Sequence, residues 1–94
     1  MLDINRPLLL DDSIVLRGLG NKYWALNTSS GNQYRLNDVS CFILNLLRIQ
    51  MSTEQVVEEV LREYAVAREQ AEVDCRRVLQ YAVENSIVKE VNNT

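Results

Sequence analysis

Acidic side chains are the first candidates for chemistry in this sequence, because paired carboxylates can act as general acid and base or hold a metal ion. The second half of the chain carries Glu58, Glu59, Glu69, Glu72 and Asp74. Arginines are interleaved with these acids over the same stretch. Solvent-exposed helices with weak ion pairs three and four residues apart have this pattern. We therefore predict surface ion pairs here rather than a catalytic or metal site.

The sequence contains no histidine, the usual acid–base group near neutral pH, the commonest metal ligand and the base of many nucleophilic sites. Cys41 and Cys75 are too few and too far apart for a zinc cluster or a disulfide framework, so we expect two free thiols. Cys41 lies away from the apolar face of its predicted helix, but a thiol without a neighbouring base is a poor nucleophile. The three glycines form no phosphate-binding loop. We expect a protein that is not an enzyme and holds no metal or cofactor.

Length and charge narrow the class of protein further. Ninety-four residues, 47% of them hydrophobic, make one small domain. Residues 1–37 carry four basic and three acidic side chains, a charge of +1. Residues 38–94 carry six basic and ten acidic side chains, a charge of −4, so the whole chain has a net charge of −3. This acidic balance argues against nucleic acid as the partner. The chain has no apolar run for a membrane span and starts unlike a signal peptide, so we expect a cytoplasmic location.

The first half of the sequence has the residue pattern of strands. Residues 13–19 and 22–27 are rich in branched and aromatic side chains and are separated by the turn pair Gly20-Asn21, which predicts a hairpin. A second group of turn formers precedes residues 32–36, where apolar and polar side chains alternate as in a half-buried third strand. Residues 1–12 have no firm pattern, and we expect a flexible arm there.

The second half of the sequence has the pattern of three helices. The first follows an N-cap at Asn37 or Asp38 and runs to about Arg48, with one apolar face made of Val39, Phe42, Ile43, Leu46 and Leu47. The second starts at a capping box formed by Ser52 and Gln55 and ends near Tyr64. Strands followed by helices indicate the α+β class, with a three-stranded antiparallel N-terminal sheet followed by three helices.

The third helix is predicted over residues 68–85, followed by a short extended segment at 87–91. Its apolar stripe consists of mostly small residues: Ala71, Cys75, Val78 and Ala82. Leu79 lies on one shoulder of this stripe, and Asp74 and Tyr81 lie on the other. Small side chains let another element approach closely or leave a shallow groove beside the helix.

The third strand offers a binding site made of backbone. An extended peptide can add a strand to the edge of an antiparallel sheet, taking affinity from main-chain hydrogen bonds. The segment of residues 32–36 is short, polar on one face and free of proline, which suits such an edge. An edge that is merely polar and solvated has the same pattern, so both interpretations stay open from the residues alone.

Several motifs together resemble the PqqD-like family, the peptide-recognition elements of pathways that modify ribosomally made peptides. They are Gly31-x-x-Tyr34-x-Leu36-Asn37, Ser52-x-Glu54-x-Val56-Val57 with Tyr64, Asp74 followed by Val78-Leu79, and Ile87-Val88. The resemblance covers residues 13–91, as one domain. Proteins of pyrroloquinoline quinone synthesis typically carry Pro-Glu-Gly before the Leu-Asn motif and Asp-Gly after the first helix, which this chain lacks. It is more similar to the standalone leader-binding proteins of lasso-peptide clusters.

The resemblance implies a winged-helix-like fold that binds the leader of a precursor peptide as an added strand. The leader would pair with the backbone of Asn32, Gln33, Tyr34, Arg35 and Leu36, and would lie in a groove beside the third helix. That helix would supply Val78 and Tyr81 as apolar contacts and Asp74 and Arg77 as polar ones. With the helix turned the other way, Leu79 and Arg76 would take their place. Asp74 fits a structural ion pair equally well.

The resemblance also implies the partners. The bound leader would be passed to a separate protease or other modifying enzyme, and the recognition protein itself would be non-catalytic. Apart from the resemblance, an exposed strand edge and a shallow groove would let copies of the domain pair, so we expect a monomer or a weak homodimer. Two alternatives are a peptide chaperone of quinone synthesis and a winged-helix regulator that binds DNA, because fold alone does not decide function.

Overall fold

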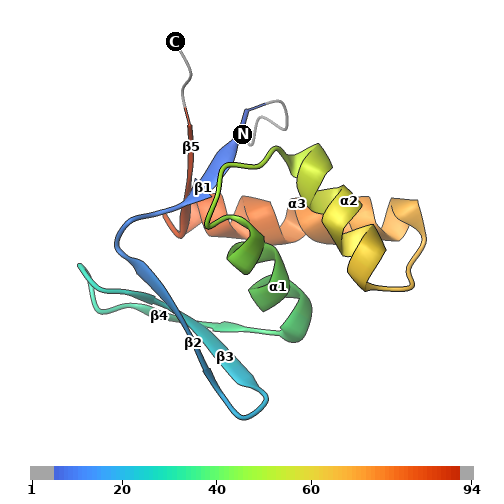
Figure 1. Ribbon diagram of the computed structural model, residues 1–94. Helices are drawn as coiled ribbons and strands as arrows, with labels where there is room; N and C mark the ends of the chain where they lie inside the picture. The colour runs from blue at the N-terminus through green and yellow to red at the C-terminus, as the bar shows by residue number, and fades with distance from the viewer. Residues whose placement is uncertain (1–5, 92–94) are drawn as a thin grey trace.

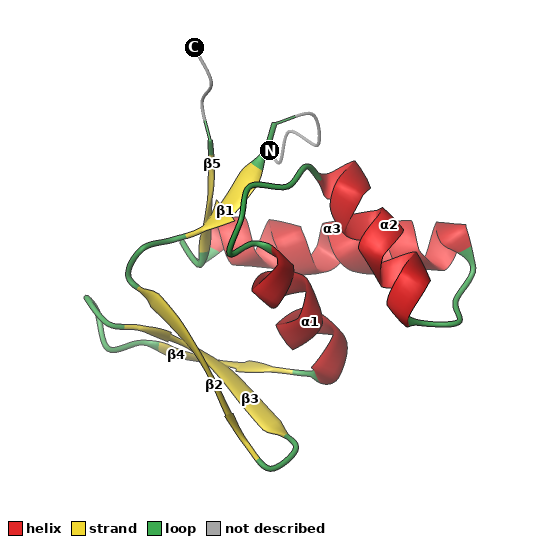
Figure 2. Cartoon of the chain, in the orientation of Figure 1, coloured by secondary structure: helices red, strands yellow, loops and turns green. Residues whose placement is uncertain are grey.

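The computed structural model describes residues 6–91, and Figure 1 shows the order of their elements in space. The elements are β1 (Leu8–Leu10), β2 (Ile14–Leu19), β3 (Lys22–Asn27), β4 (Gln33–Leu36), α1 (Asp38–Leu46), α2 (Thr53–Glu63), α3 (Arg68–Glu84) and β5 (Val88–Glu90). The sheet of β2, β3 and β4 lies on one side of the helices, with α1 nearest to it (Figure 2). The predicted α+β class and the order of sheet and helices are confirmed. No helix of the described chain is long and apolar enough to span a membrane.

The three-stranded sheet is antiparallel in the order β2-β3-β4, so β4 is an edge strand. Gly20 at the first turn and Gly31 at the second have φ of 64° and 81°, which glycine adopts without the strain other residues incur. The Asn27 side chain holds the second turn by accepting hydrogen bonds from the N–H groups of Ser29 and Ser30. Both turns were predicted from these residue types.

A second, two-stranded sheet was not predicted. β1 pairs antiparallel with β5, with Leu8 opposite Glu90 and Leu10 opposite Val88. Leu8 is fully buried, so the expectation of a flexible arm is wrong for β1, while residues 1–5 of that arm lie outside the described residues. Three consecutive leucines show no period, and their strand partner lies some eighty residues away, so the local pattern contained no signal.

Helix α1 begins where predicted, because the Asn37 side chain accepts a hydrogen bond from the N–H of Ser40 at 2.8 Å. Helix α2 has the predicted capping box, in which Ser52 and Gln55 each satisfy the other's backbone N–H. The single apolar face predicted for α1 is incomplete, because Leu44 is also buried. Helix α1 contacts the sheet, α2 and α3, so it buries more than one side.

Helix α3 packs through small residues, as predicted. Ala71, Cys75 and Ala82 are at most 1% exposed. The fourth core position is Leu79, which is fully buried, rather than Val78, which is only partly buried. The helix is therefore rotated slightly from the predicted orientation, and Val78 lies at the margin between the core and a groove.

Candidate functional site

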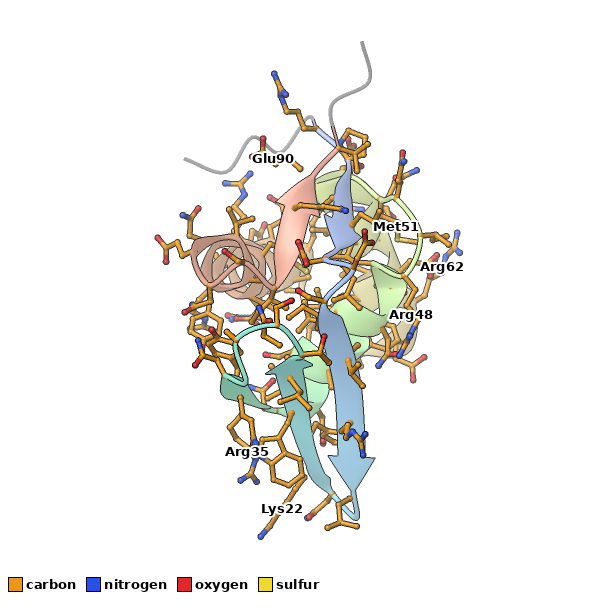
Figure 3. The ribbon with its side chains drawn as sticks, turned by 90° about the vertical axis from the view of Figure 1, so that its left-hand side faces the viewer. Lys22, Arg35, Arg48, Met51, Arg62 and Glu90 are labelled. Carbon is orange, nitrogen blue, oxygen red and sulfur yellow. The ribbon has the colours of Figure 1, made fainter. Side chains whose placement is uncertain are left out.

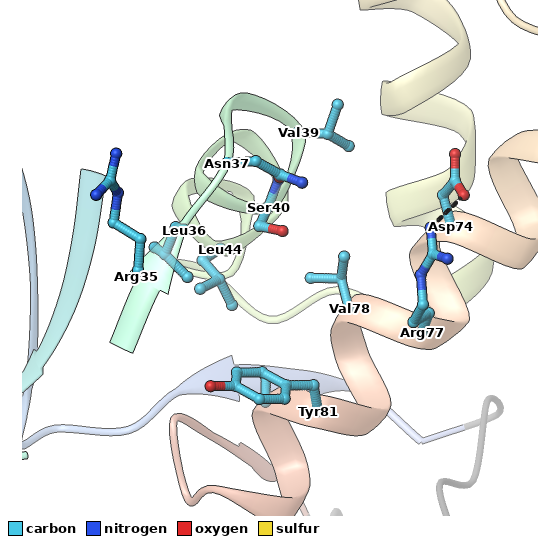
Figure 4. Close-up of a pocket in the computed structure, with 11 residues that line it drawn as sticks. Arg35, Leu36, Asn37, Val39, Ser40, Leu44, Asp74, Arg77, Val78 and Tyr81 are labelled. Carbon is cyan, nitrogen blue, oxygen red and sulfur yellow. Dashed lines mark hydrogen bonds and ion pairs between the residues drawn. The ribbon is translucent and has the colours of Figure 1, made fainter. Parts of the chain in front are cut away.

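A groove lies where β4, the start of α1 and α3 meet, and it encloses a cavity of about 310 Å³ (Figure 4). Strand β4 contributes Arg35 and Leu36. Helix α1 and its N-cap contribute Asn37, Val39, Ser40 and Leu44, and α3 contributes Asp74, Arg77, Val78, Tyr81 and Ala82. Helix α3 contacts both α1 and α2. The groove thus depends on contacts between elements that lie far apart in the sequence.

The floor of the groove is apolar. Leu36, Leu44 and Ala82 are at most 6% exposed, so a side chain entering the groove would meet buried aliphatic groups. At one end, the ring of Tyr81 meets the ring of Tyr34 edge to face, with centroids 6.3 Å apart. Edge-to-face pairs are favourable beyond their buried area. This contact connects β4 to α3 and stabilises the spacing between the two walls.

The other end of the groove is polar. Asp74 accepts hydrogen bonds from Arg77 at 2.8 Å and from Gln70 at 2.9 Å through the same oxygen. The Arg77 side chain is 74% exposed and that of Asp74 only 27%. Exposed ion pairs contribute little to stability, so exchanging this pair for contacts with a bound group would cost little. Asp74 therefore has an ion-pair partner and also lines the groove.

The open edge of β4 borders the groove. Asn27 donates its N–H to the carbonyl of Asn32 at 2.9 Å, and Ala25 stands opposite Tyr34. Because hydrogen-bonded and non-hydrogen-bonded pairs alternate along an antiparallel ladder, Tyr34 is bonded to β3. The N–H and C=O groups of Gln33 and Arg35 then point away from the sheet. Among residues 6–91, no strand pairs with this edge.

The structure brings together most of the residues predicted from the sequence. Arg35 and Leu36 of β4 and the four predicted residues of α3 line the same cavity, and Tyr34 adjoins it through Tyr81. Asn32 and Gln33 come directly before these residues of β4 in the sequence; both are exposed and neither lines the cavity. The opposite orientation of α3 does not occur, because Leu79 is buried and Arg76 lines a different hollow beside α2.

Sequence reasoning missed the contribution of α1 to this site. Asn37, Ser40 and Leu44 line the cavity together with Val39, although only Val39 was assigned to an apolar face. The high apolar content of residues 38–46 was the available signal, since a helix that is hydrophobic on more than one side is buried on more than one side.

The two thiols lie outside the groove. Burial raises the pKa of the Cys75 thiol to about 11, with a smaller contribution from Asp74. Burial also raises the pKa of Cys41, although a hydrogen bond from Asn45 acts in the opposite direction. Both shifts disfavour the reactive thiolate. Among the described residues, no group of three or more His, Cys, Asp or Glu side chains could hold a metal ion.

Fold and site together define a small α+β protein with an open strand edge beside an apolar groove. Residues 13–88 match the family model described as coenzyme PQQ synthesis protein D (PqqD), and the chain belongs to the PqqD family. No curated protein sequence matches it.

Two solved structures are similar to the chain over most of its length. One is "TbiB1 in Complex with the TbiA(beta) Leader Peptide", with a TM-score of 0.76 and 22% identity over 90% of this chain and 99% of that one. The other is "Lasso peptide synthetase B1 complexed with the leader peptide", with a TM-score of 0.73 and 26% identity over 87% and 96% of the two chains.

Proposed function

We propose that this protein binds the leader region of a ribosomally made precursor peptide, as an antiparallel strand added to β4, in lasso-peptide biosynthesis. The observation that carries the proposal is the open edge of β4 beside an apolar groove. Family membership and the two leader-peptide complexes of similar fold support it. The protein acts without catalysis and without a cofactor, in the cytoplasm, as a monomer or a weak homodimer.

The chemistry of the site suits this role. Backbone N–H and C=O groups of Gln33 and Arg35 supply main-chain hydrogen bonds, which give affinity without depending on the leader's side chains. The apolar floor of Leu36, Leu44 and Ala82 supplies selectivity. Every second side chain of an extended peptide faces the same side, and the groove accepts an apolar side chain from that side. The Asp74–Arg77 pair at the polar end offers both a donor and an acceptor.

The bound leader is then presented to a separate protease or other modifying enzyme of the same pathway. A DNA-binding regulator of similar fold is less well supported, because residues 38–94 carry a net charge of −4, which repels phosphates. A chaperone of quinone synthesis is also less well supported, because the two solved structures carry leader peptides and one is a lasso peptide synthetase component.

Amide hydrogen exchange measured by NMR tests the added strand directly. The probe is a synthetic peptide with the leader sequence of the cognate precursor, which is first identified by sequencing the genes that neighbour the gene of this chain. In the free protein, we expect the N–H groups of Gln33 and Arg35 to exchange rapidly and that of Tyr34 to be protected by β3. Saturating leader should protect Gln33 and Arg35. Leader binding that leaves both amides unprotected would exclude strand addition at β4, and absence of leader binding would exclude the proposed function.

A further inference from the structure

The outer face of the three-stranded sheet, opposite the helices, is the second surface with a distinctive composition. Side chains of a strand alternate between the two faces of a sheet. Leu16, Tyr23, Ala25, Tyr34 and Leu36 pack into the core. Their neighbours therefore form the outer face: Val15, Arg17, Leu19, Lys22, Trp24, Leu26, Gln33 and Arg35. Figure 3 views the molecule from this side and shows Lys22 and Arg35 on the sheet.

The centre of the outer face is apolar, and its rim is basic. Trp24 stands directly opposite Arg17 on one side and Arg35 on the other. The guanidinium of Arg35 lies 5.3 Å from the centroid of the Trp24 ring, within the range of a cation–π interaction. Tryptophan and arginine are the residue types that contribute most to protein–protein binding. Val15 remains 39% exposed beside them.

The charge of this face differs in sign from that of the rest of the chain. Residues 13–37 contain three basic side chains, Arg17, Lys22 and Arg35, and no Asp or Glu. Since the whole chain has a net charge of −3, the remainder carries −6. The positive charge of the sheet is thus concentrated on one face, around a partly exposed apolar centre. An acidic surface with an apolar centre is complementary to it.

We infer that the outer face of the β2-β3-β4 sheet docks the enzyme that acts on the leader, through an acidic patch on that enzyme. This inference rests on the proposed function. A leader added to β4 extends the same sheet, so an enzyme seated on the outer face would also contact the outward side chains of the leader. Three cations are too few for tight binding to a polyanion while the remaining −6 repels it, which favours a protein over nucleic acid or an anionic membrane.

The test compares two double variants with the same change in net charge. Arg17→Glu with Lys22→Glu alters the outer face, and Arg48→Glu with Arg62→Glu alters exposed positions away from it (Figure 3). Affinity for the leader-processing enzyme of the same pathway, identified together with the precursor, is measured by calorimetry with the leader bound. We expect the first variant to bind the enzyme at least about tenfold more weakly and the control to bind within about twofold of wild type.

Leader affinity, measured separately by fluorescence anisotropy, distinguishes this inference from the proposed function. We expect both double variants to bind the leader as wild type does, because none of the four positions lies at β4 or the groove. If the outer-face variant binds the enzyme normally, or if the control loses as much affinity, the inference is wrong while leader binding still stands.

Additional probes cover misfolding and the other classes of partner. If the outer-face Glu variant does not fold, Arg17→Gln with Lys22→Gln replaces it, with a smaller loss expected. Wild type and the outer-face variant are also tested for binding to a 20-base-pair DNA duplex and to phosphatidylglycerol vesicles. If the wild type binds either one and the variant does not, the assignment to a protein partner is overturned. Concentration-dependent self-association lost in that variant would overturn it in favour of a second copy of this chain.

Discussion

Replacing Gln33 with proline is the most direct chemical test of strand addition. Gln33 is exposed, and its N–H points away from β3, so proline removes a donor from the open edge without breaking the β3-β4 ladder. Proline is tolerated on edge strands for this reason. Gln33 is a better position than Arg35, because Arg35 also stacks on Trp24 and lines the groove.

The expected loss follows from one missing hydrogen bond at a partly desolvated interface. A leader carbonyl that loses its donor is left unsatisfied, at a cost of about 1–3 kcal/mol. Since about 1.4 kcal/mol corresponds to a tenfold change, we expect leader affinity to fall about 5- to 150-fold. Fluorescence anisotropy with a labelled synthetic leader measures this change. Gln33→Ala, which keeps the N–H, is the matched control and should bind within about twofold of wild type.

Circular dichroism and a thermal melt establish that the proline variant is folded. The reasoning is refuted if folded Gln33→Pro binds the leader as tightly as Gln33→Ala does. Should the variant not fold, N-methylation along the synthetic leader supplies the same test with the protein unchanged. Strand addition predicts that methylation weakens binding at every second leader residue, because alternate N–H groups face β4. A uniform effect along the leader would contradict it.

Three further predictions concern stability and reactivity. The Thr53 hydroxyl is buried and has no hydrogen-bond partner among the described residues. Thr53→Val should therefore raise the free energy of unfolding in urea by about 1 kcal/mol, whereas Thr53→Ser should lower it. Destabilisation by valine would show that the hydroxyl does have a hydrogen-bond partner. The Cys75 thiol is buried and its pKa is raised to about 11, so it should not react with a disulfide reagent at pH 8 until the protein unfolds. Cys41 should react more slowly than free cysteine. Rapid labelling of Cys75 in the native protein would contradict its burial. Hydrogen bonds from the side chain and N–H of Ser13 lower the pKa of Asp11 from 3.8. This carboxylate therefore stabilises the fold above pH 4, and its contribution is lost as the pH falls through its lower folded pKa. Asp11→Ala should flatten the acid side of a plot of unfolding free energy against pH, and an unchanged plot would exclude this role.

The helices and the three-stranded sheet were predictable because their signals are local. The capping box of Ser52 and Gln55, the Asn37 cap and the turns at Gly20 and Gly31 involve residues at most a few positions apart. Such contacts form within a single turn of chain, so residue type and spacing suffice to predict them. The pairing of β1 with β5 has no such signal, because its two strands come from opposite ends of the described chain.

The candidate site was predictable in its residues but not in its shape. The helix wheel placed Asp74, Val78 and Tyr81 on one side of α3, and the alternation of residues 32–36 placed Tyr34 and Leu36 on one face of a strand. Whether these two surfaces meet depends on the rotation of α3 in the core. That rotation is set by Leu79, which occupies the core position predicted for Val78.

By itself, the sequence determined the order of the elements from β2 to α3, the two turns, the absence of histidine chemistry and the uneven distribution of charge, because these follow from residue type and local spacing. Only the tertiary structure decided that β4 has an open edge, that α1 contributes to the floor of the groove and that the basic side chains of the sheet share its outer face. These features depend on the burial of apolar surface between distant segments, and that packing sets which backbone groups and side chains remain available to a partner.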